Sequence, residues 1–290
     1  MFRVQKLGLI GDSAFLNKVF EESKYVNGLK VSALQTKKSS IMNKELRKCS
    51  RNRVIDDSDA IYIRSKPTLH YNQIKNALMT VLCESPISLN MKQTEELFSL
   101  AREKKLVLME AIKTAYATAF SRLILLIKGG KIGDIVSIDA TCTSLNKTDW
   151  HGICEWAPTA LLPIFELLGT NFEKKIITHL DENGVDLFTK IDFVFDNAVA
   201  SIKVGDGVKS EGELIISGTK GYLYIPAPWW KTDYFEIRYE NSNDNQRYFY
   251  QLDGEGIRYE LVAFSRAIES GKVISNIKYE TSIAISKIME

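Results

Sequence analysis

The spacing of apolar positions changes along the chain, and its clearest unit lies between residues 60 and 86. Residues 60–63 form a short apolar run, residues 69–79 carry helical spacing, and residues 81–83 are apolar again. This order predicts a strand, a helix and a second strand. Strands joined by a helical crossover run parallel, so the unit predicts a sheet buried on both faces, with a ligand crevice at the carboxyl ends of its strands.

The same pattern extends over the first 113 residues. Further buried strands are expected at residues 6–11, 29–34 and 106–109, and further helices at residues 14–25, 41–49 and 90–104. Strands that alternate with helices indicate an α/β fold, here a Rossmann-like, doubly wound parallel sheet. We place the boundary of this first domain near Lys113, so that it spans residues 1–113.

Beyond residue 132 the apolar period becomes two. Strand candidates lie at residues 135–143, 174–180, 186–195, 198–204, 213–217, 222–225, 234–239 and 247–252, and helical patterns at residues 115–128, 158–168, 255–270 and 279–289. Closely spaced strands separated by turn signals predict an open, mostly antiparallel sheet. We therefore expect residues 114–290 to form an α+β domain with a large sheet.

The motifs around the crossover resemble those of a known family. His70 follows a Ser-Lys-Pro turn, the next strand ends in Glu-Ser-Pro at residues 84–86, and residues 106–116 read LVLMEAIKTAY. In order and spacing these features are similar to the Gfo/Idh/MocA family of NAD(P)-dependent oxidoreductases and to its dihydrodiol-dehydrogenase-like branch. The resemblance implies hydride transfer between NAD(P) and a sugar-like or cyclic polyol substrate. It also implies a dinucleotide-binding first domain and a second domain for substrate and oligomerisation, in a homodimer or homotetramer.

The first strand–helix turn keeps part of a Rossmann fingerprint. Gly11 is present, but Ser13 and Leu16 occupy the positions of the second and third glycines. The second glycine lets the backbone approach a pyrophosphate, and the third lets helix and strand pack closely. Asp12 either brings a negative charge near the phosphates or caps the helix, and Ser13 is an equal candidate for the cap.

The end of the second predicted strand bears on the choice of cofactor. An acid that holds the ribose 2′-hydroxyl of NAD is expected there, but residues 35–40 contain none and include Lys37 and Lys38. These lysines favour weak binding of NADP over NAD, whereas a solvated surface turn is the other interpretation. The candidate cofactor-binding residues are Gly11, Ser13, Ala14, Lys37, Ser65, His70 and Glu84.

The resemblance also implies a catalytic lysine in a Glu-Lys-Pro turn, and an aspartate followed four residues later by histidine or tyrosine. The corresponding positions here hold Ser85, Glu155 and Thr159. Neither hydroxyl titrates near neutral pH, so another group must transfer the proton. Lys113, at the end of a strand facing the same crevice, is the first candidate, with substrate anchoring or solvation as its alternatives. His151 is a second candidate, or a surface residue.

A tryptophan pair marks a further candidate site. Trp229, Trp230 and Lys231 follow two prolines in a loop that the resemblance places near the pocket mouth. Adjacent indole rings suit a stacking platform for a sugar ring, and they suit a hydrophobic plug or a subunit contact equally well.

Composition limits the classes of function without choosing among them. The net charge is +2, with acidic and basic residues interspersed, so no nucleic-acid footprint is expected. The four cysteines lack CxxC spacing, and no metal site is predicted. No signal peptide or membrane span is expected, which predicts a cytoplasmic protein. Two functions remain open: an oxidoreductase, and a catalytically inactive family member that serves as a binding or regulatory subunit.

Overall fold

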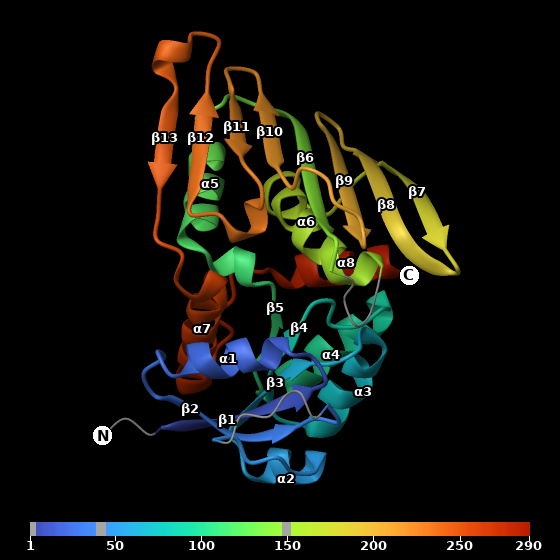
Figure 1. The fold of residues 1–290 in the computed structure, drawn as a ribbon, viewed down its shortest axis with the longest axis vertical. Coiled ribbons are helices and arrows are strands. Elements are labelled where there is room, and N and C mark those ends of the chain that lie inside the picture. Colours follow the sequence, from blue (N-terminus) through green and yellow to red (C-terminus); the bar gives the residue numbers. More distant parts are fainter. Residues whose placement is uncertain (1–3, 39–44, 147–151) are drawn as a thin grey trace. The chain divides into compact units, whose positions relative to one another are not determined.

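The computed structural model describes residues 4–38, 45–146 and 152–290, and the chain divides into two compact units (Figure 1). Unit 1 comprises Met1–Lys113 and Asp253–Glu290, and unit 2 comprises Thr114–Leu252. The first segment of unit 1 ends at Lys113. Residues 253–290 differ from the expectation, because they return to unit 1 instead of continuing the second domain.

Unit 1 is built on a five-stranded sheet in the order β2-β1-β3-β4-β5, with every neighbouring pair parallel. Its strands are β1 (Gln5–Gly11), β2 (Leu29–Gln35), β3 (Ala60–Arg64), β4 (Thr80–Glu84) and β5 (Leu108–Ala111). Strands β3, β4 and β5 are buried at most of their positions, as expected for a parallel sheet covered on both faces. The predicted Rossmann-like sheet is confirmed.

The helices of unit 1 come from both segments of the chain. They are α1 (Phe15–Ser23), α2 (Arg51–Asp56), α3 (Pro67–Ala77), α4 (Met91–Glu103), α7 (Ile257–Ser270) and α8 (Tyr279–Met289). Helix α7 packs on α1, and α8 packs on α4. Polar contacts hold both helices in unit 1: Gln5 Nε2 of β1 donates to the carbonyl of Ser265 in α7 at 3.4 Å, and the hydroxyls of Thr94 in α4 and Ser286 in α8 are 2.7 Å apart. The amphipathic pattern of α7 and α8 predicted helices but carried no information on which unit they cover.

One predicted helix has a different structure in its described part. Residues 41–44 of the expected helix 41–49 lie outside the described residues. The amide of Leu34 donates to the carbonyl of Arg47, and the amide of Cys49 donates to the carbonyl of Leu34. These bonds extend the edge of the sheet beside β2, so the prediction of a helix ending at Cys49 is wrong there. The helix begins two residues later, as α2.

Unit 2 contains an eight-stranded sheet in the order β13-β12-β11-β10-β6-β9-β8-β7. Its strands are β6 (Ile135–Ser144), β7 (Lys174–Glu182), β8 (Val185–Val194), β9 (Val199–Asp206), β10 (Leu214–Gly218), β11 (Tyr222–Ile225), β12 (Tyr234–Arg238) and β13 (Gln246–Phe249). All neighbours are antiparallel except β6 and β9, which are parallel. The predicted large, mostly antiparallel sheet is confirmed.

Two helices, α5 (Thr118–Lys128) and α6 (Ile153–Leu168), pack against the sheet of unit 2. Helix α6 contacts β6, β8 and β9, where alternate residues such as Ile138, Ile191 and Ile202 are fully buried. Four short 3₁₀ segments lie at Lys113–Tyr116, Trp229–Lys231, Ser242–Asp244 and Asp253–Gly256. Across the described ranges of the chain, we find no helix with the length and apolar character needed to span a membrane.

Candidate cofactor and substrate sites

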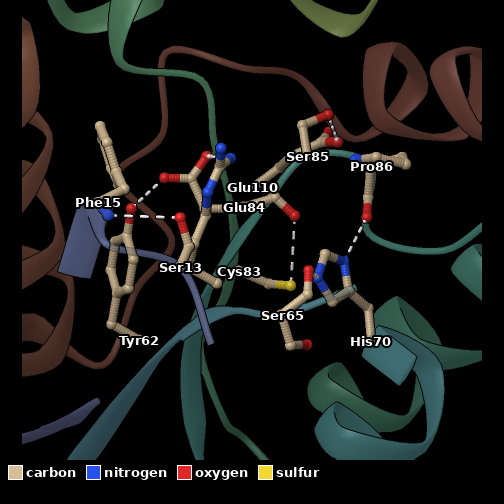
Figure 2. Close-up of polar contacts among 11 residues, drawn as sticks. Ser13, Phe15, Tyr62, Ser65, His70, Cys83, Glu84, Ser85, Pro86 and Glu110 are labelled. Carbon is tan, nitrogen blue, oxygen red and sulfur yellow. Dashed lines mark hydrogen bonds and ion pairs between the residues drawn. The ribbon is translucent and has the colours of Figure 1, made fainter. Parts of the chain in front are cut away.

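The carboxyl ends of the strands in unit 1 carry several of the predicted site residues, among them Ser13, Ser65, His70, Glu84 and Ser85 (Figure 2). Ser13 follows β1, Ser65 follows β3, Ser85 follows β4 and Lys113 follows β5. Because the strands are parallel, these ends meet at one edge of the sheet, where ligands bind in open α/β folds. This edge is the candidate cofactor site.

Gly11 ends β1 with a φ of +149°, and a Cβ atom there would lie 1.8 Å from the carbonyl oxygen of Arg64. The close passage of β3 therefore requires glycine at this position, independently of any phosphate. Leu16, at the third fingerprint position, is fully buried under α1. Its side chain occupies the space that a glycine would leave for close helix–strand packing.

The amino end of α1 has amide groups that the protein itself leaves unused. The Ser13 hydroxyl accepts from the amide of Phe15 at 3.3 Å, and Ala14 provides no side-chain cap. Within the described part of the chain, the amides of Ser13 and Ala14 donate to no other residue. Unused amides at the positive end of a helix favour an anion, so Ser13 and Ala14 fit the phosphates of a dinucleotide in spite of the missing glycine.

Asp12 does not cap α1. Its Oδ1 accepts from the amide of Lys37 at 2.5 Å and from the hydroxyl of Thr36 at 3.1 Å. The same hydroxyl accepts from the amide of Lys38 at 3.2 Å. The turn after β1 is thereby bonded to the loop after β2, while both lysine residues remain exposed. The loop contains two cations that suit a phosphate, Lys37 and Lys38. It contains no acid to hold a ribose diol.

The carboxylate of Glu84 is bonded to other side chains at this edge of the sheet. It accepts from the hydroxyl of Tyr62 through Oε1 and pairs with Arg64 Nη1 at 3.1 Å through Oε2 (Figure 2). Burial, followed by the charge of Glu84, raises the pKa of Tyr62 well above 10, so the phenol stays protonated and donates. The guanidinium of Arg64 lies 5.1 Å from the ring centre of Phe15. The predicted cofactor contact of Glu84 therefore competes with internal partners.

The side chains of His70 and Ser65 also contact groups within unit 1. The Nδ1 of His70 lies 2.8 Å from the carbonyl oxygen of Pro86, and its Nε2 lies 3.0 Å from that of Ser65. Burial lowers the pKa of His70 from 6.5 to about 4, so the ring is neutral and donates from one nitrogen. The Ser65 hydroxyl donates to Gln73 Oε1. In this structure His70 joins the loops after β3 and β4.

Ser85 occupies the position of the expected catalytic lysine. Its hydroxyl donates to Oε1 of Glu110, a residue of β5 whose side chain is fully buried (Figure 2). Burial raises the pKa of Glu110 above 4.5. Oε2 of Glu110 has no hydrogen-bond partner among the described residues. The hydroxyl of Ser85 is therefore bonded to a buried residue of the sheet, and it cannot replace the amine of a lysine in proton transfer.

Lys113 brings an amine to the same edge of the sheet, directly after β5. Its side chain is 19% exposed, its Nζ lies 2.9 Å from Glu255 Oε2, and it lies 5.4 Å from the ring centre of Phe15. Lys18 Nζ contacts the other oxygen of Glu255 at 3.1 Å. Burial, then the charge of Glu84, raises the pKa of Glu260 well above 4.5. Lys113 is thus paired with the acidic side chain of Glu255, and a second acid with a raised pKa, Glu260, lies in the same unit.

Sequence reasoning missed these two acids. Glu255 lies in the return segment after unit 2, and Glu260 lies on the buried face of α7 beside Leu261 and Phe264. A glutamate within an otherwise apolar helical face was the available signal for Glu260. No signal placed Glu255 near Lys113, because 142 positions separate them.

In unit 2, Glu155 and Thr159 stand one turn apart on α6, and both are partly exposed. The ring of Trp156 lies 5.1 Å from that of Trp230. Trp229 is fully buried, and its Nε1 donates to the carbonyl of Thr141 at 3.0 Å. The ring of Trp229 therefore belongs to the core of unit 2.

The predicted residues thus divide between the units. Gly11, Ser13, Ala14, Lys37, Ser65, His70, Glu84, Ser85 and Lys113 lie in unit 1, and Glu155, Thr159, Trp229, Trp230 and Lys231 lie in unit 2. Trp230 is 9% exposed, and Lys231 is partly exposed. His151 lies outside the described residues.

The parallel sheet of unit 1 and the large, mostly antiparallel sheet of unit 2 define a Rossmann-like domain combined with an α+β unit. Residues 24–112 match the model of an oxidoreductase family with an NAD-binding Rossmann fold, Gfo/Idh/MocA. Over these residues the chain is similar to this family, in agreement with the resemblance of its motifs.

Two curated relatives illustrate the extent of the sequence similarity. The scyllo-inositol 2-dehydrogenase (NADP(+)) IolU of Bacillus subtilis is 44% identical over 71 residues, which is 23% of this chain and 22% of that protein. The match therefore spans about a fifth of that relative. The trans-1,2-dihydrobenzene-1,2-diol dehydrogenase of Danio rerio is 24% identical over 268 residues, covering 80% of this chain and 75% of that protein.

Solved structures share the fold over nearly the whole chain. The 3-ketoreductase KijD10 of Actinomadura kijaniata, in complex with NADP and TDP-benzene, has a TM-score of 0.86 at 18% identity and covers 98% of this chain and 95% of that one. The UDP-N-acetylglucosamine 3-dehydrogenase GnnA of Acidithiobacillus ferrooxidans has a TM-score of 0.82 at 14% identity, with coverage of 98% and 95%. At these identities the likeness shows the fold.

Proposed function

We propose that this protein is an NADP-dependent oxidoreductase that acts on a sugar-like or cyclic polyol substrate. The observation that carries the proposal is the bonded pair of loops at the sheet edge of unit 1. The turn after β1 offers the amides of Ser13 and Ala14, and the loop it binds offers Lys37 and Lys38. Amides for a diphosphate and cations for a 2′-phosphate are the two requirements of an NADP site.

The residues present fit the cofactor. Ser13 and Ala14 would hold the diphosphate, and Lys37 with Lys38 would hold the 2′-phosphate of the adenosine. Gln35 and Thr36 supply no carboxylate to accept from the ribose diol of NAD. When bound, NADP supplies or accepts the hydride at C4 of its nicotinamide. The relatives named above act on an inositol, a dihydrodiol and nucleotide-linked sugars, and they support the substrate class.

Lys113 is proposed to donate and accept the proton at the substrate oxygen. Ser85 is directed to Glu110 and does not titrate near neutral pH, whereas Lys113 carries the amine at the same edge of the sheet. An amine within reach of the substrate oxygen can donate a proton during reduction of a ketone. Within unit 2, Glu155, Thr159, Trp230 and Lys231 are proposed as substrate-binding residues.

We further propose a homodimer or homotetramer in the cytoplasm. Apolar side chains are exposed along the strands of unit 2, among them Ile176, Leu180 and Phe249. A second copy of the chain that covers such side chains would remove them from water. The assembly is tested by the hydrodynamic prediction in the Discussion.

The test begins with binding. NADPH and NADH are titrated into the purified protein and followed by nicotinamide fluorescence, and we expect binding of NADPH to be the tighter. Turnover is then screened with inositols, cyclic diols and nucleotide-linked ketosugars. NADPH-dependent turnover of one of these classes supports the proposal. Tight NADH binding without NADPH binding contradicts the cofactor assignment, and NADPH binding without turnover on any class supports the inactive alternative.

A further inference from the structure

Asp12 makes a contact that the Rossmann fingerprint does not require. Its position lies between Gly11 and Ser13, in the turn that approaches a dinucleotide, yet its Oδ1 is bonded to the loop after β2. That oxygen accepts from the amide of Lys37 at 2.5 Å and from the hydroxyl of Thr36 at 3.1 Å. These partners lie 25 and 24 positions away in the sequence.

The contact continues through Thr36, which is 5% exposed. Its hydroxyl donates to Asp12 and accepts from the amide of Lys38 at 3.2 Å. The backbone amides of both lysines are therefore held, one by Asp12 directly and one through Thr36. A hydrogen bond from an amide to a carboxylate is charge-assisted and stronger than one to a neutral acceptor.

We propose that Asp12 determines cofactor specificity by holding the loop so that Lys37 and Lys38 are presented to the 2′-phosphate of NADP. The inference rests on the proposed function, and it adds a residue outside the lysine pair. Asp12 acts as a positioning residue: it touches the loop, and the lysines bind the phosphate. Its effect is confined to ligands that carry a 2′-phosphate.

The charge of Asp12 provides the contrary hypothesis. A carboxylate that faced the diphosphate would repel it, and it would weaken NADPH and NADH alike. In the structure the accepting oxygen is directed to Thr36 and Lys37, where an amide and a hydroxyl compensate it. When the charge is removed and an oxygen acceptor is kept, as in Asp12→Asn, positioning predicts little change in affinity, whereas repulsion predicts tighter binding of both dinucleotides.

The experiment compares the full-length wild type with Asp12→Asn, Asp12→Ala and a control, Asp56→Ala, which removes an exposed acid of α2. Dissociation constants are measured for NADPH and NADH, and for 2′,5′-ADP and 5′-AMP, which differ only in the 2′-phosphate. Circular dichroism melting curves show that each variant is folded. We expect Asp12→Ala to weaken NADPH and 2′,5′-ADP by about 10-fold, the size of a lost interaction of about 1.4 kcal/mol, and to change NADH and 5′-AMP less than about twofold.

Asp12→Asn is expected to stay within about threefold of the wild type for every ligand, since its amide oxygen still accepts from the loop. A double substitution, Lys37→Ala with Lys38→Ala, should cause the same selective loss. Adding Asp12→Ala to that double substitution should cause no further loss, because the groups that it positions are gone. If Asp12→Ala folds poorly, Asp12→Asn and the lysine double substitution are compared with the wild type instead.

Several results overturn the inference. Tighter binding of both dinucleotides by Asp12→Asn shows repulsion, equal weakening of NADPH and NADH by Asp12→Ala shows a general role in the turn, and additive losses in the cycle show that Asp12 acts independently of the lysines. The failure of the proposed function is a separate outcome. A folded wild type that binds neither dinucleotide contradicts both, whereas a wild type that prefers NADPH with an unaffected Asp12→Ala contradicts only the role of Asp12.

Discussion

The hydroxyl of Ser85 donates a hydrogen bond to Oε1 of Glu110, whose carboxyl group is fully buried (Figure 2). The serine stands where the family motif has a lysine, and its side chain is directed into unit 1. The contact gives a buried carboxyl group one of its few partners, since its second oxygen has none among the described residues. At this position the chain has a structural hydrogen bond in place of a titratable amine.

Removing that partner should destabilise the protein. We expect Ser85→Ala to lower the free energy of unfolding by about 1–3 kcal/mol, the cost of leaving a buried acceptor unsatisfied. Urea denaturation followed by circular dichroism measures it. The control Ser99→Ala, at an exposed serine of α4, should change the stability by less than about 0.5 kcal/mol. Equal stability of Ser85→Ala and wild type would show that the hydrogen bond contributes nothing.

Lys113 should matter for turnover and not for cofactor binding. We expect Lys113→Met to lower kcat by about 10²- to 10⁴-fold, because a proton-transfer group is lost, while the dissociation constant of NADPH stays the same. Steady-state kinetics with the substrate found in the screen measures it. The matched control is Lys18→Met, which removes the other lysine bound to Glu255 and should retain activity. Unchanged kcat in Lys113→Met would leave the lysine with a structural role.

His70 should make stability depend on pH in a defined window. Its pKa is about 4 in the folded protein and about 6.5 in the unfolded chain, so the unfolded chain binds more protons between these values. Stability therefore falls as the pH is lowered from about 6.5 to about 4, and the contribution of this residue reaches about 3 kcal/mol. Urea unfolding at several pH values should show a smaller loss in His70→Gln than in wild type.

The control for this window is His179→Gln, at an exposed histidine of β7. This variant should follow the wild-type pH dependence, because it keeps both His70 and the carboxyl groups that titrate in the same range. A wild-type curve that is parallel to that of His70→Gln would contradict the assignment of a neutral, buried His70.

The exposed apolar side chains of unit 2 should be covered by another copy of the chain. We expect sedimentation to show a dimer or tetramer at micromolar concentration, and not the 32.8 kDa monomer. Phe249→Lys, at a side chain that is 72% exposed on β13, should shift the assembly toward monomer. Leu69→Lys, at a 45% exposed side chain of α3 in unit 1, is the control and should not. A wild-type monomer would contradict this prediction.

Much of the fold followed from local pattern. The predicted strands at residues 60–63 and 81–83 are β3 (Ala60–Arg64) and β4 (Thr80–Glu84), because strands covered on both faces are continuous apolar runs. Period-two alternation indicated the sheet of unit 2, because successive side chains of a strand point to opposite faces of the sheet. Apolar periodicity did not assign α7 and α8 to unit 1, since an amphipathic face shows that a helix is covered but not by what.

The candidate site depended more on tertiary structure. The sequence and its resemblance identified the turn at Gly11, the lysine loop, Ser85 and Lys113 as positions of interest. They did not show that Asp12 binds the loop after β2 or that Glu255 holds Lys113, contacts that span 25 and 142 positions. Residue type and periodic burial are local properties, which a sequence carries. A hydrogen-bond partner is chosen by distances of about 3 Å between elements remote in the chain, and only the folded arrangement sets those distances.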